Sequence, residues 1–171
     1  MNETLYTLKN RVSVRSYKSE QITKEELDAV LEAGKFAPTG MNRQTPVFIA
    51  VQDKKTRDEL SSLNASFMNR EGDPFYGAPT VVCVLVKEGI YTNLEDGSLA
   101  IGNMLNAAAS IGLGSCWIHR CKEMFESEYG KQLLDKLGLE GYIGVGCCIL
   151  GYPEGDMPAV KERKTDYVYY V

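Results

Sequence analysis

Residues 93–111 read NLEDGSLAIGNMLNAAASI, and the fold can be worked out from this stretch. Its larger apolar residues recur at helical spacing: Leu94, Ile101, Met104, Leu105, Ala108 and Ile111. Small residues occupy many of the positions between them: Gly97, Ala100, Gly102, Ala107 and Ala109. Other elements can approach such a helix closely from several sides. The stretch therefore predicts a central helix in the core or at a subunit interface.

Apolar strands are predicted on both sides of this helix. Residues 80–86 and 142–150 are apolar without alternation, which is typical of strands buried on both faces. Shorter strands are expected at 47–51 and 115–118. Helices are predicted at 4–10, after the capping box that begins at Thr23, after Asp53, and over 122–137. This alternation predicts one α/β or α+β domain over residues 1–171.

Composition narrows the possible partners. The chain has 171 residues, 44% hydrophobic, with a formal net charge of -4. Basic residues do not cluster, so we expect no nucleic-acid partner. No apolar run reaches the length of a membrane span, and the start of the chain is too polar for a signal peptide. A cytoplasmic protein without a membrane partner is expected.

The cysteines and the single histidine offer little for a metal or a disulfide framework. The five cysteines are Cys83, Cys116, Cys121, Cys147 and Cys148. The number is odd and no C-x-x-C pair occurs, so reduced packing thiols are expected and no metal site. His119 is interpreted as a surface histidine in preference to a proton donor. A dyad with Cys116 or Cys121 stays conceivable but lacks an orienting third group.

The first candidate site is the segment from Arg11 to Tyr17, which reads RVSVRSY. In an extended chain Arg11, Ser13 and Arg15 point to one side, while the valines between them point into the core. Two guanidinium groups around a hydroxyl suit a phosphate monoester. An ordinary solvated edge strand is the competing interpretation.

The second candidate is the loop Ala37 to Gln44, which reads APTGMNRQ and follows a predicted helix end. Asn42 and Gln44 offer both donors and acceptors, which suits a flat heterocycle with imide edges. A plain loop after a helix is equally compatible. Familiar nucleotide motifs are missing: there is no P-loop, and Gly144-Val145-Gly146 is interpreted as strand packing rather than a dinucleotide fingerprint.

Taken together, these motifs resemble the FMN-dependent nitroreductase family. Two further stretches carry the resemblance: Gly112 to Ile118, which reads GLGSCWI, and Gly151-Tyr152-Pro153 at the end of an apolar strand, followed by a basic tail. The order and spacing agree over nearly the whole chain. Gly40 stands where a small hydroxyl residue is usual in the family, and Thr45-Pro46 replaces a common tryptophan.

The resemblance implies a role for each matching residue. Arg11 and Ser13 would bind the FMN phosphate, and Arg15 would reach the ribityl chain or the N1–C2=O edge. The other expected cofactor contacts are Pro38, Thr39, Asn42 and Gln44 from the second loop, Cys116, Trp117 and Ile118 along the flavin, and Arg163 with Lys161 or Lys164 returning to the phosphate.

The resemblance also implies the architecture and the chemistry. The fold would be α+β, with a central, mainly antiparallel sheet flanked by helices, and the protein would be a homodimer with FMN sites at its interface. Pro38, Thr39 and Asn42 would come from the subunit opposite Arg11. NAD(P)H would reduce FMN, and a small acceptor such as a nitroaromatic or a quinone would reoxidise it in ping-pong order. Dehalogenation, ring oxidation or a non-catalytic flavin-binding module are the alternatives.

Overall fold

Four strands form the antiparallel sheet at the centre of the molecule, in the order β1-β2-β4-β3. The computed structural model describes residues 1–69 and 71–171. The strands are β1 (Val47–Val51), β2 (Thr80–Lys87), β3 (Gly114–Ile118) and β4 (Tyr142–Gly151). β2 and β4 are the central pair and are buried over almost their whole length, as predicted. The predicted α+β class with an antiparallel sheet is confirmed.

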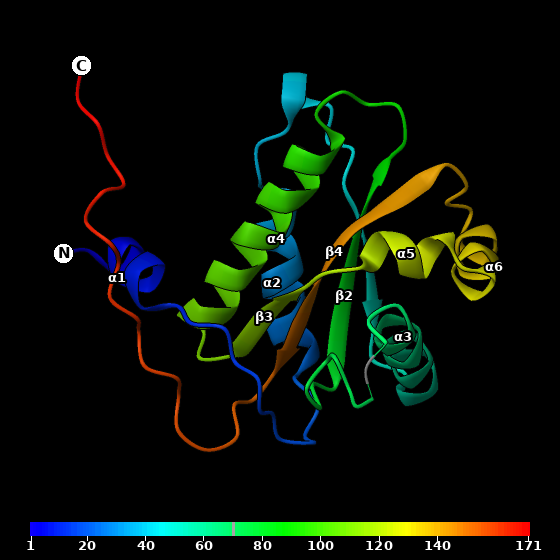
Figure 1. Ribbon diagram of the computed structural model, residues 1–171, viewed down its shortest axis with the longest axis horizontal. Helices are drawn as coiled ribbons and strands as arrows, with labels where there is room; N and C mark the ends of the chain where they lie inside the picture. Colours follow the sequence, from blue (N-terminus) through cyan, green and yellow to red (C-terminus); the bar gives the residue numbers. More distant parts are fainter. Residues whose placement is uncertain (70) are drawn as a thin grey trace.

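Helices cover both faces of this sheet (Figure 1). On one face, α2 (Lys24–Lys35) and α4 (Asn93–Ser110) pack against Val82, Val84 and Cys148. On the other face, α3 (Lys54–Ser66), α5 (Cys121–Glu126) and α6 (Glu128–Leu137) enclose a second cluster with Leu60 and Met124. A short α1 (Glu3–Asn10) lies beside α4, outside these layers. The predicted central helix is therefore one wall of the core.

Local sequence explains where the helices begin. The Thr23 hydroxyl accepts the Glu26 amide at 3.1 Å and the Glu26 carboxylate accepts the Thr23 amide, so the predicted capping box starts α2. Asp53 caps the start of α3, where its carboxylate accepts the Thr56 amide at 2.8 Å. The predicted single helix over 122–137 is wrong, because Ser127 is extended and begins a new helix at Glu128, where its hydroxyl accepts the Gly130 amide at 3.0 Å. Gly130 then packs directly on the Met124 carbonyl, where a Cβ would clash.

The glycines of β4 allow close packing, in agreement with the interpretation of Gly144-Val145-Gly146. A Cβ on Gly146 would lie 2.8 Å from the Trp117 ring, and one on Gly144 would lie 2.4 Å from the Cys121 backbone. Gly146 therefore leaves room for the Trp117 ring of β3, and Gly144 lets α5 approach the sheet closely.

The segment after Pro153 is exposed throughout and forms no helix or strand. It runs along the outside of the molecule past α1 (Figure 1). Its apolar end, Tyr167 to Val171, contributes side chains that are 62–128% exposed. This apolar end therefore remains exposed in the single chain. Among the described helices, none is long and apolar enough to cross a membrane.

Candidate functional site

The segment Arg11 to Tyr17 extends the sheet at the free edge of β3. Ser13 forms a parallel bridge with Ser115, and the Val14 amide donates to the Ser115 carbonyl at 3.0 Å. Val14 is buried, and the buried Tyr17 hydroxyl donates to the Val14 carbonyl at 2.8 Å. The two strongest motifs of the sequence, RVSVRSY and GLGSCWI, are thus neighbours in space.

Arg11 is half-buried at the end of α1, and part of its guanidinium group lacks a hydrogen-bond acceptor among the described residues. Its Nη1 atom is buried and finds no hydrogen-bond acceptor among the described residues. The residue lines a hollow of about 290 Å³ together with Ala109, Gly112 and Met157. A buried guanidinium nitrogen without an acceptor is costly, so an anion that enters this hollow would be strongly favoured.

In the single chain Arg15 lies against Tyr76 and does not line the hollow beside Arg11. Its guanidinium lies 5.8 Å from the centre of the exposed Tyr76 ring, a cation–π arrangement. Tyr76 has a φ of 54°, which is uncommon for a bulky residue. The turn that holds it is fixed by Asp73, whose carboxylate accepts from the Phe75 and Gly77 amides, Ser61 and Arg57. Sequence reasoning missed Tyr76, because its partner Arg15 lies far away in the sequence.

The three expected residues of β3 alternate between the faces of the sheet. Cys116 and Ile118 are buried in the cluster beneath α3, α5 and α6, whereas half-buried Trp117 packs on the α4 side above Gly146. A planar ligand can therefore meet all three only along the strand edge. Cys116 and Cys121 are buried, and the side chain of His119 is exposed at the strand end.

The second candidate loop has an unusual backbone. Met41, Asn42 and Gln44 all have φ values of 52–55°, although none is glycine. The Thr39 hydroxyl accepts the Gln44 amide at 3.0 Å, and the Gln44 side-chain amide donates to the Asn42 oxygen at 3.1 Å. Pro38 is exposed. Non-glycine residues with positive φ carry backbone strain, so they persist only where surrounding contacts fix them. Such strained residues cluster at ligand-binding sites.

Asp96 is the contact that fixes this loop. It is 2% exposed in α4 and accepts the Gly40 amide at 2.8 Å and the Thr92 hydroxyl at 3.1 Å. A Cβ on Gly40 would lie 2.3 Å from Thr92, which explains why glycine replaces the usual hydroxyl residue. The acidic pair Glu95-Asp96 at a helix start was visible in the sequence, but its partner 56 residues away was not.

The two candidate motifs lie at opposite ends of α4 within one chain. Gly40 is bonded to Asp96 in the first turn of α4, whereas Arg11 shares its hollow with Ala109 in the last turn. At the helical rise of 1.5 Å per residue, these turns are about 20 Å apart. The single chain does not bring Arg11 and Asn42 together.

Comparisons with known proteins agree with the motifs and with the fold. The model of the nitroreductase family matches residues 8–161. The chain belongs to the nitroreductase family.

Individual relatives support this assignment. A nitroreductase from Bacteroides fragilis, solved with bound FMN, is 33% identical, covers all of both chains and superposes with a TM-score of 0.91. A protein of Archaeoglobus fulgidus named as an NADH dehydrogenase or NAD(P)H nitroreductase is 32% identical over 91% of this chain and 88% of its own. An FMN reductase [NAD(P)H] of Bacillus subtilis is 26% identical over 95% of this chain and 70% of its own.

The basic tail of this nitroreductase-family chain does not reach the Arg11 hollow in the single copy. Lys161, Arg163 and Lys164 are exposed, and the Lys164 ammonium lies 5.1 Å from the Tyr167 ring. Met157 of the same tail does line the hollow. The tail therefore begins at the candidate site and continues away from it.

Proposed function

We propose that this FMN-dependent NAD(P)H oxidoreductase reduces a small planar acceptor, such as a nitroaromatic or a quinone, by a ping-pong mechanism. One observation carries the cofactor assignment within the chain itself. The buried Arg11 Nη1 lacks an acceptor among the described residues, and Arg11 lines a hollow beside the segment Arg11 to Tyr17. A single terminal phosphate would supply the acceptor that this nitrogen lacks.

The residues around Arg11 fit the phosphate of FMN. Ser13 supplies a hydroxyl from the neighbouring position of the same extended segment. Arg163 or Lys164 can add a second charge when the tail is held down. Bound FMN supplies two-electron chemistry, taking hydride from NAD(P)H and giving the electrons to the acceptor in a second half-reaction.

The remaining site residues would hold and tune the ring. Arg15 would leave Tyr76 and place its charge near the pyrimidine edge, where negative charge develops on reduction. Thr39, Asn42 and Gln44 would offer polar contacts from their fixed loop. Trp117 would stay on Gly146 and shape the strand edge. No nucleophile of the protein is needed for this chemistry.

We infer that each site is built from two copies of the chain. Arg11 and Asn42 lie at opposite ends of α4, and a two-fold axis across that helix would bring the Arg11 end of one copy to the Asn42 end of the other. Apolar side chains along this surface are exposed in the single chain: Leu5, Leu8, Leu94, Leu99, Tyr167, Val168, Tyr169 and Tyr170. Surfaces of this kind mark association sites.

The test is reduction of the purified, flavin-loaded protein without oxygen. Addition of NADH or NADPH is expected to bleach the flavin absorbance, and a later addition of nitroaromatic or quinone is expected to restore it. Parallel lines in double-reciprocal plots would support ping-pong order. A flavin that neither nicotinamide reduces would indicate a binding module instead. Turnover with halophenols alone would favour dehalogenation.

A further inference from the structure

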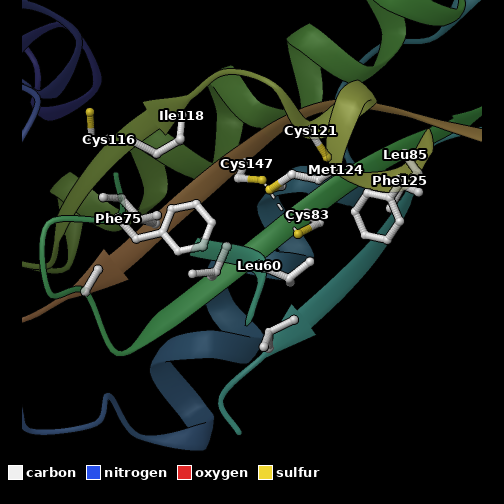
Figure 2. Packing of buried hydrophobic residues seen from close by; sticks show 14 of the residues in the cluster. Leu60, Phe75, Cys83, Leu85, Cys116, Ile118, Cys121, Met124, Phe125 and Cys147 are labelled. Carbon is white, nitrogen blue, oxygen red and sulfur yellow. Dashed lines mark hydrogen bonds between the residues drawn. The ribbon is translucent and has the colours of Figure 1, made fainter. Parts of the chain in front are cut away.

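Three cysteines from three different elements converge in the core beneath α3, α5 and α6. Cys83 lies on β2, Cys147 on β4 and Cys121 at the first position of α5. Their sulfur atoms all lie within 4.8 Å of one another (Figure 2). We call this group the three-thiol cluster. The sequence gives no hint of it, because the members are 26–64 residues apart and lack metal-site spacing.

We propose that the three-thiol cluster is a binding site for monovalent copper, separate from the flavin. The fold preforms this arrangement by two independent means. Cys83 and Cys147 are direct cross-strand partners, and their sulfurs are 3.6 Å apart. Cys121 is brought down onto the sheet by Arg120, which has a φ of 71°, and by Gly144, which leaves no side chain under the Cys121 backbone.

The spacing of the sulfurs matches what one metal ion requires. A metal–sulfur bond is about 2.3 Å, so three sulfurs around one ion lie about 3.8–4.0 Å apart. Cys83 and Cys147 already lie just inside that separation at 3.6 Å, and the third sulfur lies within 4.8 Å of both. Shifts smaller than about 1 Å at each sulfur, within reach of side-chain rotation, would close the site.

The chemical type of the three ligand atoms indicates which metal ion the cluster would bind. The group contains sulfur only, without a histidine or a carboxylate among the described residues. Soft thiolate ligands favour Cu(I), Zn and iron–sulfur clusters. Structural zinc takes four ligands and this cluster supplies three, whereas Cu(I) accepts three sulfurs. The surroundings are apolar, with Leu60, Phe75 and Ile149 in the same cluster, and they would exclude water and hard ligands.

Full burial determines how the site would be loaded. All three cysteines are 0% exposed, so copper would enter as the core closes or when α5 opens transiently. The thiols that become thiolate ligands would release their protons to water at that stage, as metal binding requires. The experiment therefore offers Cu(I) to the full chain both during refolding with FMN and in the native state. Copper is supplied without oxygen from a coloured Cu(I) chelator complex, and the loss of colour counts the copper transferred.

The chain provides a matched control. Cys148 is adjacent to Cys147 and equally buried, but it faces the opposite side of the sheet, towards α4. The wild type and Cys148→Ala are expected to take up one equivalent of copper. Cys83→Ala, Cys121→Ala and Cys147→Ala are expected to lose that uptake while they keep their FMN.

The proposal is wrong if the wild type takes up no copper by either route, or if uptake is the same in all four variants. If the cluster variants do not fold, X-ray absorption of the copper-loaded wild type decides. Three sulfur neighbours around copper support the site, and nitrogen, oxygen or fewer sulfur neighbours overturn it. These readouts do not depend on NAD(P)H oxidation, so they can fail without affecting the proposed activity.

Discussion

At the scale of single residues, we propose that Arg11 binds the cofactor phosphate, because its buried Nη1 has no acceptor among the described residues. We predict that Arg11→Ala weakens FMN binding by about one to two orders of magnitude, since a charge-assisted contact contributes about 1.5–3 kcal/mol. Titration of the apoprotein with FMN measures this. Lys9→Ala removes the same charge from the exposed end of α1 and should leave the dissociation constant unchanged. An unaltered constant in Arg11→Ala would remove this residue from the site.

The charge of Arg15 should act on the reduction of the flavin more than on its binding. We predict that Arg15→Met lowers the reduction potential of bound FMN, because the cation stabilises the negative charge of the reduced ring. Arg15→Lys, which keeps the charge, should stay close to the wild type. Spectroelectrochemistry of the three proteins compares them. A potential that is unchanged or higher in Arg15→Met contradicts the role proposed for Arg15.

Asp73 should stabilise the fold in a pH-dependent way. Burial opposes its ionisation, but hydrogen bonds from Arg57, Ser61 and two backbone amides outweigh it and lower the pKa of Asp73. A lowered pKa gives stability that is present above the ordinary aspartate pKa of about 3.9 and is lost as the pH falls through the folded value. Asp73→Asn should therefore cost about 1.5–3 kcal/mol near neutral pH and less in acid. Urea unfolding of the apoprotein at several pH values tests this, with exposed Asp135→Asn as control; an equal cost at all pH values would contradict it.

At the scale of elements, the short helical turn Gly40–Asn42 depends on its bond to α4. We predict that Asp96→Ala loosens this loop and lowers FMN occupancy, although Asp96 itself binds no cofactor. Visible circular dichroism of bound FMN should also change, because the ring loses a fixed neighbour. Glu95→Ala, in the same helical turn but exposed, is the control. Normal occupancy and an unchanged spectrum in Asp96→Ala would show that the loop holds its shape alone.

The elements themselves were largely predictable, because local signals define them. Apolar runs predicted β1, β2, β3 and β4, and the capping residues Thr23 and Asp53 located two helix starts. The break between α5 and α6 was missed because Ser127 also fits inside a helix. The new start there is favoured by the cap that the Ser127 hydroxyl provides for the Gly130 amide and by the contact of Gly130 with the Met124 carbonyl.

The site was predictable only where its residues are close in sequence. The segment Arg11 to Tyr17 and the loop Ala37 to Gln44 were identified as motifs, and the structure places the first beside β3. Asp96 and Tyr76 were missed because each acts on a partner more than 50 residues away. The three-thiol cluster was missed because its members also lie far apart in the sequence. The pairing of β2 with β4 brings Cys83 to Cys147.

At the scale of the whole molecule, the two candidate motifs lie at opposite ends of α4 in one chain. Arg11 lines a hollow at one end of α4 and its Nη1 has no acceptor in the part of the chain that the structure describes, whereas Asn42 lies in a fixed, exposed loop at the other end. The apolar tail and the exposed face of α4 would be costly in an isolated copy. We therefore infer that a second copy brings the Arg11 end and the Asn42 end together, so that each flavin is shared.

Mixing two defective variants tests this claim most directly. Arg11→Ala and Asn42→Ala are each expected to hold little FMN alone. When they are unfolded together and refolded as mixed dimers, one of the two sites should receive Arg11 from one copy and Asn42 from the other, both intact. Isolated mixed dimers are expected to bind one FMN per dimer with the wild-type dissociation constant. If the mixed dimers bind FMN no better than the separate variants, each site is built within one chain and the account is wrong.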